Sequence, residues 1–295
     1  MTDPTAARPR PAAPATPDDL PADQQRLTRA FPWLVARGLT NIQAKPLGGL
    51  SNDNWRLDTP AGAFVLRVPR PDPAGYILDR ADEIRVTAAA AKAGFAPALH
   101  ASDAENGLIL SRFVDDAAAA TRADVVRVGK ALGKLHRSKL PIERRFDPFA
   151  LIRDYRARLG SRDPLTPQLK AALFRAEQLA DHVKTVPSHG DPVPENLLVS
   201  PAGVVFIDWE YAALASPTWD LAYFILHAGL AVSEEAALIK AYGSKSFYAS
   251  QMRAAKLAVA LVGALWSMVR EDGEPNAYAA TCLGWAEAIA EGWVG

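Results

Sequence analysis

Residues 188–196 of this chain read Ser-His-Gly-Asp-Pro-Val-Pro-Glu-Asn, and residues 206–211 read Phe-Ile-Asp-Trp-Glu-Tyr. Between these two stretches lie short apolar runs on either side of a Ser-Pro-Ala-Gly turn, a pattern that predicts a β-hairpin. Asn196 stands just before the first strand of this hairpin, and Asp208 stands just after the second. We therefore expect the amide and the carboxylate to lie close together.

These polar side chains suit phosphoryl transfer. Asp191 precedes a proline, which disfavours helical backbone and predicts a rigid loop that exposes the carboxylate. Phosphoryl transfer needs a positioned acceptor hydroxyl and a metal that neutralises the phosphates. Asp191 could accept the hydroxyl proton, and Asn196 and Asp208 could hold Mg²⁺, which prefers oxygen ligands and takes few of them from protein. Aspartate and asparagine are also common turn residues, but their joint spacing favours the catalytic interpretation.

The composition is that of a globular protein. Of the 295 residues, 49% are apolar and 22% are charged, and 33 basic residues balance 33 acidic ones. Because the net charge is zero, nothing global indicates a nucleic-acid partner or an anionic membrane. The single cysteine, Cys282, excludes an intramolecular disulfide and a cysteine-based zinc cluster.

The N-terminal segment and the apolar runs predict the cellular setting. Residues 1–24 are rich in proline and alanine, lack the apolar core of a secretory signal and are expected to form a flexible tail. No apolar run approaches the roughly 20 residues of a membrane span. We expect a soluble, cytoplasmic protein with no membrane partner, and the sequence leaves the oligomeric state open.

Residues 25–115 are expected to form a small β-rich lobe. A helical pattern begins near Asp23 and ends at Gly38, and Pro32 is predicted to kink or divide this helix. The other predicted elements of the lobe are strands at 42–47, 54–58 and 64–68, a helix at 79–93, and strands at 98–101 and 108–113.

Residues 116–295 are expected to form a larger, mostly helical lobe that the motif region interrupts. The predicted helices cover residues 122–137, 147–159, 167–183, 217–227, 233–241, 247–270 and 275–292. A β-rich lobe followed by a helical lobe is an α+β arrangement. The cleft between two lobes is the natural place for a ligand.

The motif resembles that of the aminoglycoside phosphotransferase and choline kinase superfamily, which shares the protein-kinase-like fold, and it is most similar to bacterial choline kinases. The resemblance extends over most of the chain beyond the tail. It implies that Asp191 is the catalytic base and that Asn196 and Asp208 bind magnesium. It also implies structural roles for His189, which would steady the loop, and for Asp220, which would brace it.

The same resemblance assigns nucleotide-binding residues in the small lobe. The stretch Gly-Gly-Leu-Ser-Asn at 48–52 falls where the family covers the phosphates of ATP, and it supplies Gly49, Ser51 and Asn52. Glycines permit a close approach of the backbone, whose N–H groups can bind anionic oxygens. Arg67 takes the position of the strand cation that holds the phosphates, and Glu83 on the following helix would be its partner.

The sequence around the motif also indicates which class of acceptor is phosphorylated. Asp208–Ala212 and Trp219–Ala222 look closer to bacterial choline kinases and to thiamine kinases than to antibiotic-modifying relatives. Aromatic faces and a nearby carboxylate hold a quaternary ammonium group well. Trp266 matches one tryptophan of a choline kinase Trp-x-x-Trp pair, and Glu210 could supply negative charge.

Three positions depart from the choline kinase pattern. Gly263 replaces the first tryptophan of the pair, and His227 stands where choline kinases place a choline-facing glutamate. Gly190 replaces the asparagine that is usual in choline kinases, which gives the His-Gly-Asp of the aminoglycoside enzymes.

The sequence thus predicts an ATP- and Mg²⁺-dependent phosphotransferase that acts on the hydroxyl of a small amino alcohol, choline first and ethanolamine or thiamine next. The alternative is an aminoglycoside or other small-alcohol phosphotransferase, whose acceptor site would need several carboxylates. Candidates for these on the C-terminal helices are Glu271, Asp272, Glu274 and Glu287. Two further classes are a non-catalytic pseudokinase and a purely structural interaction module.

Overall fold

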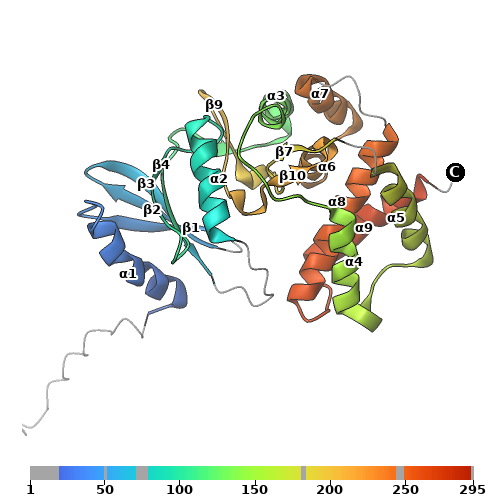
Figure 1. Ribbon diagram of the computed structural model, residues 1–295, viewed down its shortest axis with the longest axis horizontal. Helices are drawn as coiled ribbons and strands as arrows, with labels where there is room; N and C mark the ends of the chain where they lie inside the picture. Colours follow the sequence, from blue (N-terminus) through green and yellow to red (C-terminus); the bar gives the residue numbers. More distant parts are fainter. Residues whose placement is uncertain (1–19, 50–51, 71–78, 181–183, 244–248, 294–295) are drawn as a thin grey trace, which may run out of the picture. The chain divides into compact units, whose positions relative to one another are not determined.

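The computed structural model describes residues 20–49, 52–70, 79–180, 184–243 and 249–293 (Figure 1). These residues belong to two compact units, 1–70 and 71–295. The first unit contains one helix and three strands, and the second contains the remaining elements. The compact units divide the chain after residue 70, whereas the sequence predicts a boundary between two lobes after residue 115. That boundary stays a prediction.

The first unit is a three-stranded antiparallel sheet with one helix. β1 (Gln43–Gly48) pairs with β2 (Asn52–Thr59), which pairs with β3 (Gly62–Pro69). β2 and β3 correspond to the strands predicted at 54–58 and 64–68. The buried apolar residues of this unit come from β2, β3 and α1 (Ala22–Val35), and include Leu27, Ala30, Leu34, Trp55, Leu57, Phe64, Leu66 and Val68.

Helix α1 contains Pro32 and is not divided there, so that part of the prediction was wrong. Proline removes one intrahelical hydrogen bond and is most costly in the middle of a helix. Pro32 stands in the last turn, and the N–H of Ala36 still bonds to its carbonyl oxygen at 3.0 Å. The helix therefore tolerates the proline close to its end.

The described part of the second unit begins with a capped helix and a hairpin. Asp79 accepts hydrogen bonds from the N–H groups of Ala81 and Asp82 and thereby starts α2 (Arg80–Lys92). Gly94, with a φ of 77°, follows the end of the helix. β4 (Leu99–Asp103) and β5 (Leu108–Arg112) then form an antiparallel pair. The predicted helix and strands are confirmed to within a few residues.

The rest of the second unit is mainly helical. Its helices are α3 (Val125–His136), α4 (Pro148–Leu159), α5 (Pro167–Ala180), α6 (Pro217–His227), α7 (Val232–Tyr242), α8 (Ala249–Arg270) and α9 (Ala277–Glu291). Helix α8 packs against α4, α5, α6 and α9 (Figure 1). Leu257, Leu261 and Leu265 of α8 are fully buried. The α+β fold class is confirmed.

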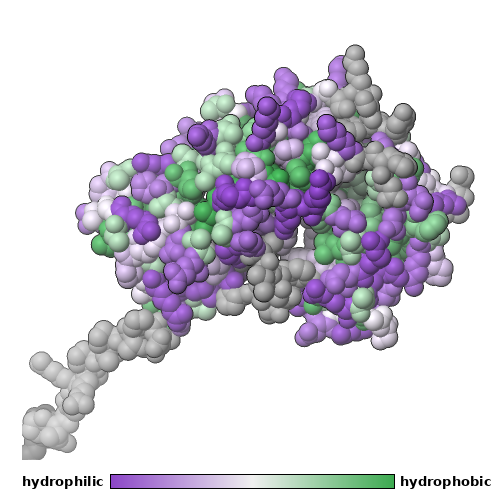
Figure 2. All heavy atoms as spheres, in the orientation of Figure 1, coloured by the Kyte–Doolittle hydropathy of each residue, from purple (hydrophilic) through white to green (hydrophobic). Residues whose placement is uncertain are grey.

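Helix α8 is long and apolar enough to cross a membrane by length and composition, so the expectation that the chain has no such stretch was wrong. In the structure, 72% of its most apolar window is buried, as in the central helix of a packed core. Figure 2 shows polar side chains over most of one face of the protein. Its burial against α4, α5, α6 and α9 favours a core helix.

Short strands surround the motif region. β8 (Leu197–Ser200) and β9 (Gly203–Phe206) form the predicted hairpin, and β6 (Ala118–Ala119) pairs with β8. β7 (Val186–Ser188) pairs with β10 (Ala213–Ala215). The sequence did not predict β6, β7 or β10, because two or three residues are too few to show an alternating pattern.

Candidate active site

The hairpin brings the first two predicted catalytic residues into direct contact. Asn196 lies in the 3-10 helix η4 (Pro194–Asn196), just before β8. Its Nδ2 donates hydrogen bonds to the carbonyl oxygen and to Oδ2 of Asp191, both at 3.0 Å. At the other end of the hairpin, the N–H of Ile207 donates to the carbonyl oxygen of Asn196 at 2.9 Å. The chain therefore reaches Asp208 beside Asn196, as predicted.

Asp208 has left-handed backbone, with φ 65° and ψ 69°. This conformation is uncommon outside glycine, and in folded proteins it is often found at functional sites. One oxygen each of Asp208, Glu83 and Glu210 lies within 4.8 Å of the other two. The loop thus directs the Asp208 carboxylate towards two further carboxylates.

The donor set fits magnesium. The amide nitrogen of Asn196 donates to Asp191, so the amide oxygen of Asn196 is available to bind a metal. Within the described ranges no donor bonds to that oxygen. Together with the carboxylate of Asp208 it gives an all-oxygen pair, which suits a hard divalent cation that keeps waters and phosphate oxygens as its other ligands.

The surroundings of Asp191 raise the proton affinity of its carboxylate. Burial raises the pKa of the Asp191 carboxyl well above its ordinary value, and the charge of Asp208 adds to this effect. The hydroxyl of Tyr223, which hydrogen-bonds to Asp191, opposes the shift. A carboxylate with a raised pKa is a stronger base. Tyr223 is not among the predicted site residues, although it lies three residues after Asp220, on the next turn of α6.

Asp220 lies under the loop that carries Asp191. Its side chain is fully buried and accepts hydrogen bonds from the N–H groups of His189 at 2.8 Å and Gly190 at 3.0 Å. Nε2 of His136 lies 3.0 Å from Oδ2 of Asp220. Burial raises the pKa of Asp220, but the hydrogen bond and charge of His136 outweigh it, so the pKa lies below its ordinary value. These are the contacts of a residue that braces the loop.

His189 is completely buried, and Nε2 of its ring lies 2.9 Å from the carbonyl oxygen of Ile207. The ring packs edge-on against Trp209, with ring centroids 5.0 Å apart. Burial lowers the pKa of His189, so the neutral ring is the stable form near pH 7. His189 therefore connects the loop before Asp191 to the strand end before Asp208.

Gly190 is required by the local packing. Its φ is 90°, and a Cβ at this position would collide with the carbonyl oxygen of Tyr211. On its other side, Nε1 of Trp219 donates a hydrogen bond to the carbonyl oxygen of Gly190 at 2.8 Å. The departure from the asparagine of choline kinases thus allows the backbone at Tyr211 to approach the loop.

An aromatic cluster lies on α6, α8 and α9. His227 stacks on Tyr223, with ring centroids 4.6 Å apart and an interplanar angle of 6°, and it meets the edge of Trp285 at 5.3 Å. Its Nε2 lies 3.1 Å from the hydroxyl oxygen of Tyr278. Burial lowers the pKa of His227. The cluster therefore has a neutral histidine where choline kinases have a glutamate.

Tyr278 and Cys282 fill the space beside Gly263. A Cβ on Gly263 would lie 3.0 Å from the hydroxyl oxygen of Tyr278 and 3.0 Å from Sγ of Cys282. Tyr278 also meets the ring of Trp266, with centroids 6.3 Å apart and an angle of 87°. An aromatic ring from α9 therefore stands where the first tryptophan of the pair on α8 is missing.

The guanidinium of Arg270 lies over one face of the Trp266 ring. Cζ of Arg270 lies 4.8 Å from the centre of the Trp266 ring, within the range of a cation–π interaction. Trp266 is half-buried and packs against the core. The predicted acceptor residues His227 and Trp266 thus both contact Tyr278, which connects them.

The predicted nucleotide-binding residues of the first unit lie on adjacent strands. With its amide oxygen facing β3, Asn52 accepts hydrogen bonds from Nη2 and Nε of Arg67 at 2.8 and 2.9 Å. Gly49 has a φ of 140°, and a Cβ there would collide with the carbonyl oxygen of Asn52. Ser51 lies outside the described residues. Asn52, Gly49 and Arg67 are therefore brought together, as a phosphate-binding site requires.

Glu83 on α2 is buried and pairs with Arg80, whose Nη1 donates to Oε2 of Glu83 at 2.9 Å. The same Nη1 donates to Oε2 of Glu210 at 3.3 Å. Arg80 is not among the predicted site residues, because it precedes Glu210 by 130 residues and stands in no motif. The predicted pairing of Glu83 with Arg67 joins the two compact units and stays a prediction.

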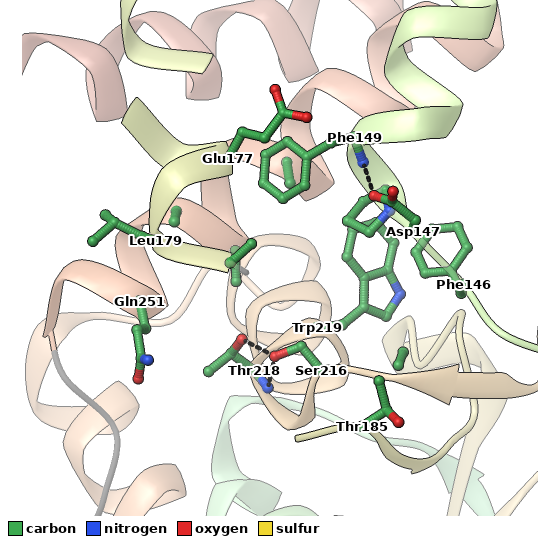
Figure 3. Close-up of a pocket in the computed structure, with 16 residues that line it drawn as sticks. Phe146, Asp147, Phe149, Glu177, Leu179, Thr185, Ser216, Thr218, Trp219 and Gln251 are labelled. Carbon is green, nitrogen blue, oxygen red and sulfur yellow. Dashed lines mark hydrogen bonds between the residues drawn. The ribbon is translucent and has the colours of Figure 1, made fainter. Parts of the chain in front are cut away.

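A separate cavity of about 190 Å³ lies among α4, α5, α6 and α8 (Figure 3). Phe146, Phe149 and Trp219 line it together with alanines of α8. None of the predicted site residues lines this cavity. It approaches the active site through Trp219, whose indole nitrogen bonds to Gly190.

Comparison with known proteins supports this assignment. The chain matches the phosphotransferase enzyme family over residues 43–255. Protein LicA of Haemophilus influenzae is 27% identical over 259 residues, which are 80% of this chain and 76% of LicA.

Two solved structures share the fold. A choline/ethanolamine kinase family protein from Mesorhizobium loti is 26% identical, with a TM-score of 0.75 over 91% of this chain and 93% of that one. Choline kinase LicA from Streptococcus pneumoniae is 22% identical, with a TM-score of 0.77 over 91% of this chain and 99% of that one. The protein-kinase-like fold is thereby confirmed. The chain belongs to the phosphotransferase enzyme family and is a small-molecule kinase related to the choline kinases.

Proposed function

We propose that the protein transfers the γ-phosphate of ATP to the hydroxyl of a small amino alcohol, choline first, with ethanolamine or thiamine next, and that it requires Mg²⁺. The observation that carries the proposal is the hydrogen-bonded pair of Asp191 and Asn196 beside Asp208, with aromatic rings on neighbouring helices. Nucleotide complexes of proteins with this fold support the use of ATP, namely LicA with AMP and a spectinomycin phosphotransferase with ADP.

Each residue of the set has a defined task in this reaction. Asn196 fixes the orientation of the Asp191 carboxylate by donating to Oδ2. Asp191 accepts the proton of the acceptor hydroxyl, and the raised pKa makes it a better base for that step. Bound Mg²⁺ would neutralise the phosphate charge, and Asn196 and Asp208 would hold it through their side-chain oxygens.

The surroundings of Asp191 favour choline over an aminoglycoside. The hydroxyl of Tyr223 hydrogen-bonds to Asp191, and burial together with the charge of Asp191 raises the pKa of Tyr211, Tyr223 and Tyr278, so three aromatic side chains lie near this carboxylate. Aminoglycosides are polycations and would need several carboxylates. Glu271, Asp272, Glu274 and Glu287 are exposed, and no described contact links them to Asp191. Aromatic rings with carboxylates nearby suit a quaternary ammonium group, and Asp208, Glu210 and Asp220 supply negative charge near Asp191.

An acceptor screen tests the proposal. ADP release is measured with ATP and Mg²⁺ in the presence of choline, ethanolamine, thiamine or kanamycin, and each reaction is repeated without Mg²⁺. We expect Mg²⁺-dependent turnover with choline. If kanamycin is the only acceptor that supports turnover, the acceptor is an aminoglycoside and not an amino alcohol. If nucleotide binds but no acceptor supports turnover, the protein is a pseudokinase.

A further inference from the structure

Three carboxylates meet beside the predicted metal ligands. Glu83 comes from α2, and Asp208 and Glu210 follow β9; one oxygen of each lies within 4.8 Å of the others. The side chains of Glu83 and Glu210 are only 2% and 3% exposed. Like charges this close repel one another strongly where water is excluded. A cation close by stabilises such a group.

Arg80 supplies one such cation. Its Nη1 donates to Oε2 of Glu83 at 2.9 Å and to Oε2 of Glu210 at 3.3 Å, so one nitrogen bridges both carboxylates. Within the part of the chain that the structure describes, the side chain of Arg80 makes these two hydrogen bonds and no other. The guanidinium thereby ties the first turn of α2 to the segment that follows Asp208.

The position of Arg80 creates a competition with the metal. A divalent cation held by Asn196 and Asp208 enters the same group of carboxylates that the guanidinium now neutralises. Two cations that share one set of anions repel each other, and each lowers the affinity for the other. A guanidinium on a flexible side chain that is 26% exposed can move away into water.

We propose that Arg80 is a displaceable counter-cation of the metal site: it occupies the carboxylates of Glu83 and Glu210 when the metal is absent, and the metal releases it on binding. Arg80 is thus a positioning residue that sets the metal affinity. The inference rests on the proposed Mg²⁺ requirement. It concerns residues of this chain alone and is independent of which alcohol is phosphorylated.

Direct metal binding tests the proposal without catalysis. Mn²⁺ is titrated into the nucleotide-free protein, and free Mn²⁺ is followed by electron paramagnetic resonance. We expect Arg80→Gln to bind Mn²⁺ about tenfold more tightly than the wild type, since a positive charge near the ion has been removed. Arg80→Lys keeps the charge and should stay within about twofold of the wild type.

Arg85→Gln is the matched control. Arg85 lies on the same helix and pairs with Asp82, outside the group of three carboxylates. We expect this variant to bind Mn²⁺ like the wild type. An equal gain in Arg80→Gln and Arg85→Gln would reduce the effect to overall charge and would overturn the proposal, and so would unchanged or weaker Mn²⁺ binding in a folded Arg80→Gln.

Chemical modification of the wild type provides a second readout that needs no variant at position 80. Phenylglyoxal reacts with accessible arginines, and the modified peptides are quantified by mass spectrometry. We expect Mn²⁺ to increase the modification of Arg80 at least about threefold while Arg85 stays constant, because a released guanidinium is more accessible. Equal modification of Arg80 with and without Mn²⁺ contradicts its displacement.

The Asp208→Asn variant separates this inference from the proposed function. If the wild type binds Mn²⁺ and Asp208→Asn does not, the metal site is supported. The Arg80 variants then test only whether Arg80 competes with the metal. If Mn²⁺ binds to neither the wild type nor Arg80→Gln, the metal requirement fails, and the role of Arg80 fails with it.

Discussion

The amide nitrogen of Asn196 donates to Oδ2 of Asp191 at 3.0 Å. One side chain therefore fixes the carboxylate that would take the proton and presents its other end, the amide oxygen, to the metal. The two tasks depend on the amide, because only an amide combines a donor and an acceptor in this geometry.

Asn196→Asp should abolish most of the activity. It replaces the donor by a second carboxylate next to Asp191, so the hydrogen bond is lost and the two anions repel. We expect kcat to fall by about 10²-fold or more, with the protein still folded by circular dichroism. Asn276→Asp is the control, because Asn276 caps α9 through its side-chain oxygen and aspartate caps equally well. Comparable losses in both variants would contradict the assigned role.

Gly190→Asn should be harmful, although choline kinases have asparagine at this position. The new Cβ would collide with the carbonyl oxygen of Tyr211 on left-handed backbone. We expect a loss of about 1–3 kcal/mol in the free energy of unfolding and at least tenfold lower activity, measured by urea titration and ADP release. Gly243→Asn is the control, since Gly243 has left-handed backbone, with φ 84° and ψ 22°, and nothing lies within 4 Å of its Cβ position. A Gly190→Asn enzyme with wild-type activity would show that the loop can move.

Gly263→Ala tests the packing that replaces the missing tryptophan. The added methyl group would lie 3.0 Å from both the Tyr278 hydroxyl oxygen and the Cys282 sulfur, so the side chains of α9 must shift. We expect a destabilisation of about 1–3 kcal/mol by urea unfolding. Gly284→Ala, on α9 with nothing close to the new methyl group, should instead stabilise by about 0.5–1 kcal/mol. The prediction fails if both substitutions stabilise the protein.

The thiol of Cys282 should react slowly in the folded protein. Burial raises the pKa of Cys282 from 9.0 to about 11, so very little thiolate forms at pH 8. A raised folded-state pKa favours the native state fully below pH 9, and this contribution is lost as the pH rises towards 11. We expect alkylation by iodoacetamide at pH 8 to be at least about tenfold faster in 8 M urea than in buffer.

A pH series completes this test. Native alkylation should rise steeply only above pH 10. The free energy of unfolding should decline over the same range more in the wild type than in Cys282→Ala. Equal rates of alkylation in buffer and in urea would show that the thiol is accessible in the folded protein.

Long periodic segments could be predicted from the sequence, and short strands could not. α6 begins and ends at the predicted residues, because its apolar residues follow the helical period and Pro217 fits its first turn. β7 and β10 have three residues each, and their pairing joins segments far apart in the chain. A local pattern contains no information about such a partner.

The candidate site divides in the same way. Asp191, Asn196 and Asp208 lie within one hairpin, so their proximity follows from local chain geometry. His136 and Arg80 reach Asp220 and Glu210 through tertiary contacts over large sequence separations. Their residue types are common on helices, and no spacing in the sequence distinguishes them. The aromatic ring beside Gly263 comes from another helix for the same reason.

Helix α8 also has a consequence for synthesis of the protein. Among the described residues it is the one helix both long and apolar enough to cross a membrane, and one of its main partners, α9, follows it in the chain. A growing chain therefore exposes the side of α8 that faces α9 until nearly all of the described residues have left the ribosome. Exposed apolar surface of this kind binds chaperones and promotes aggregation. Loss of α9 should for this reason harm solubility in the cell more than its distance from Asp191 in the sequence suggests.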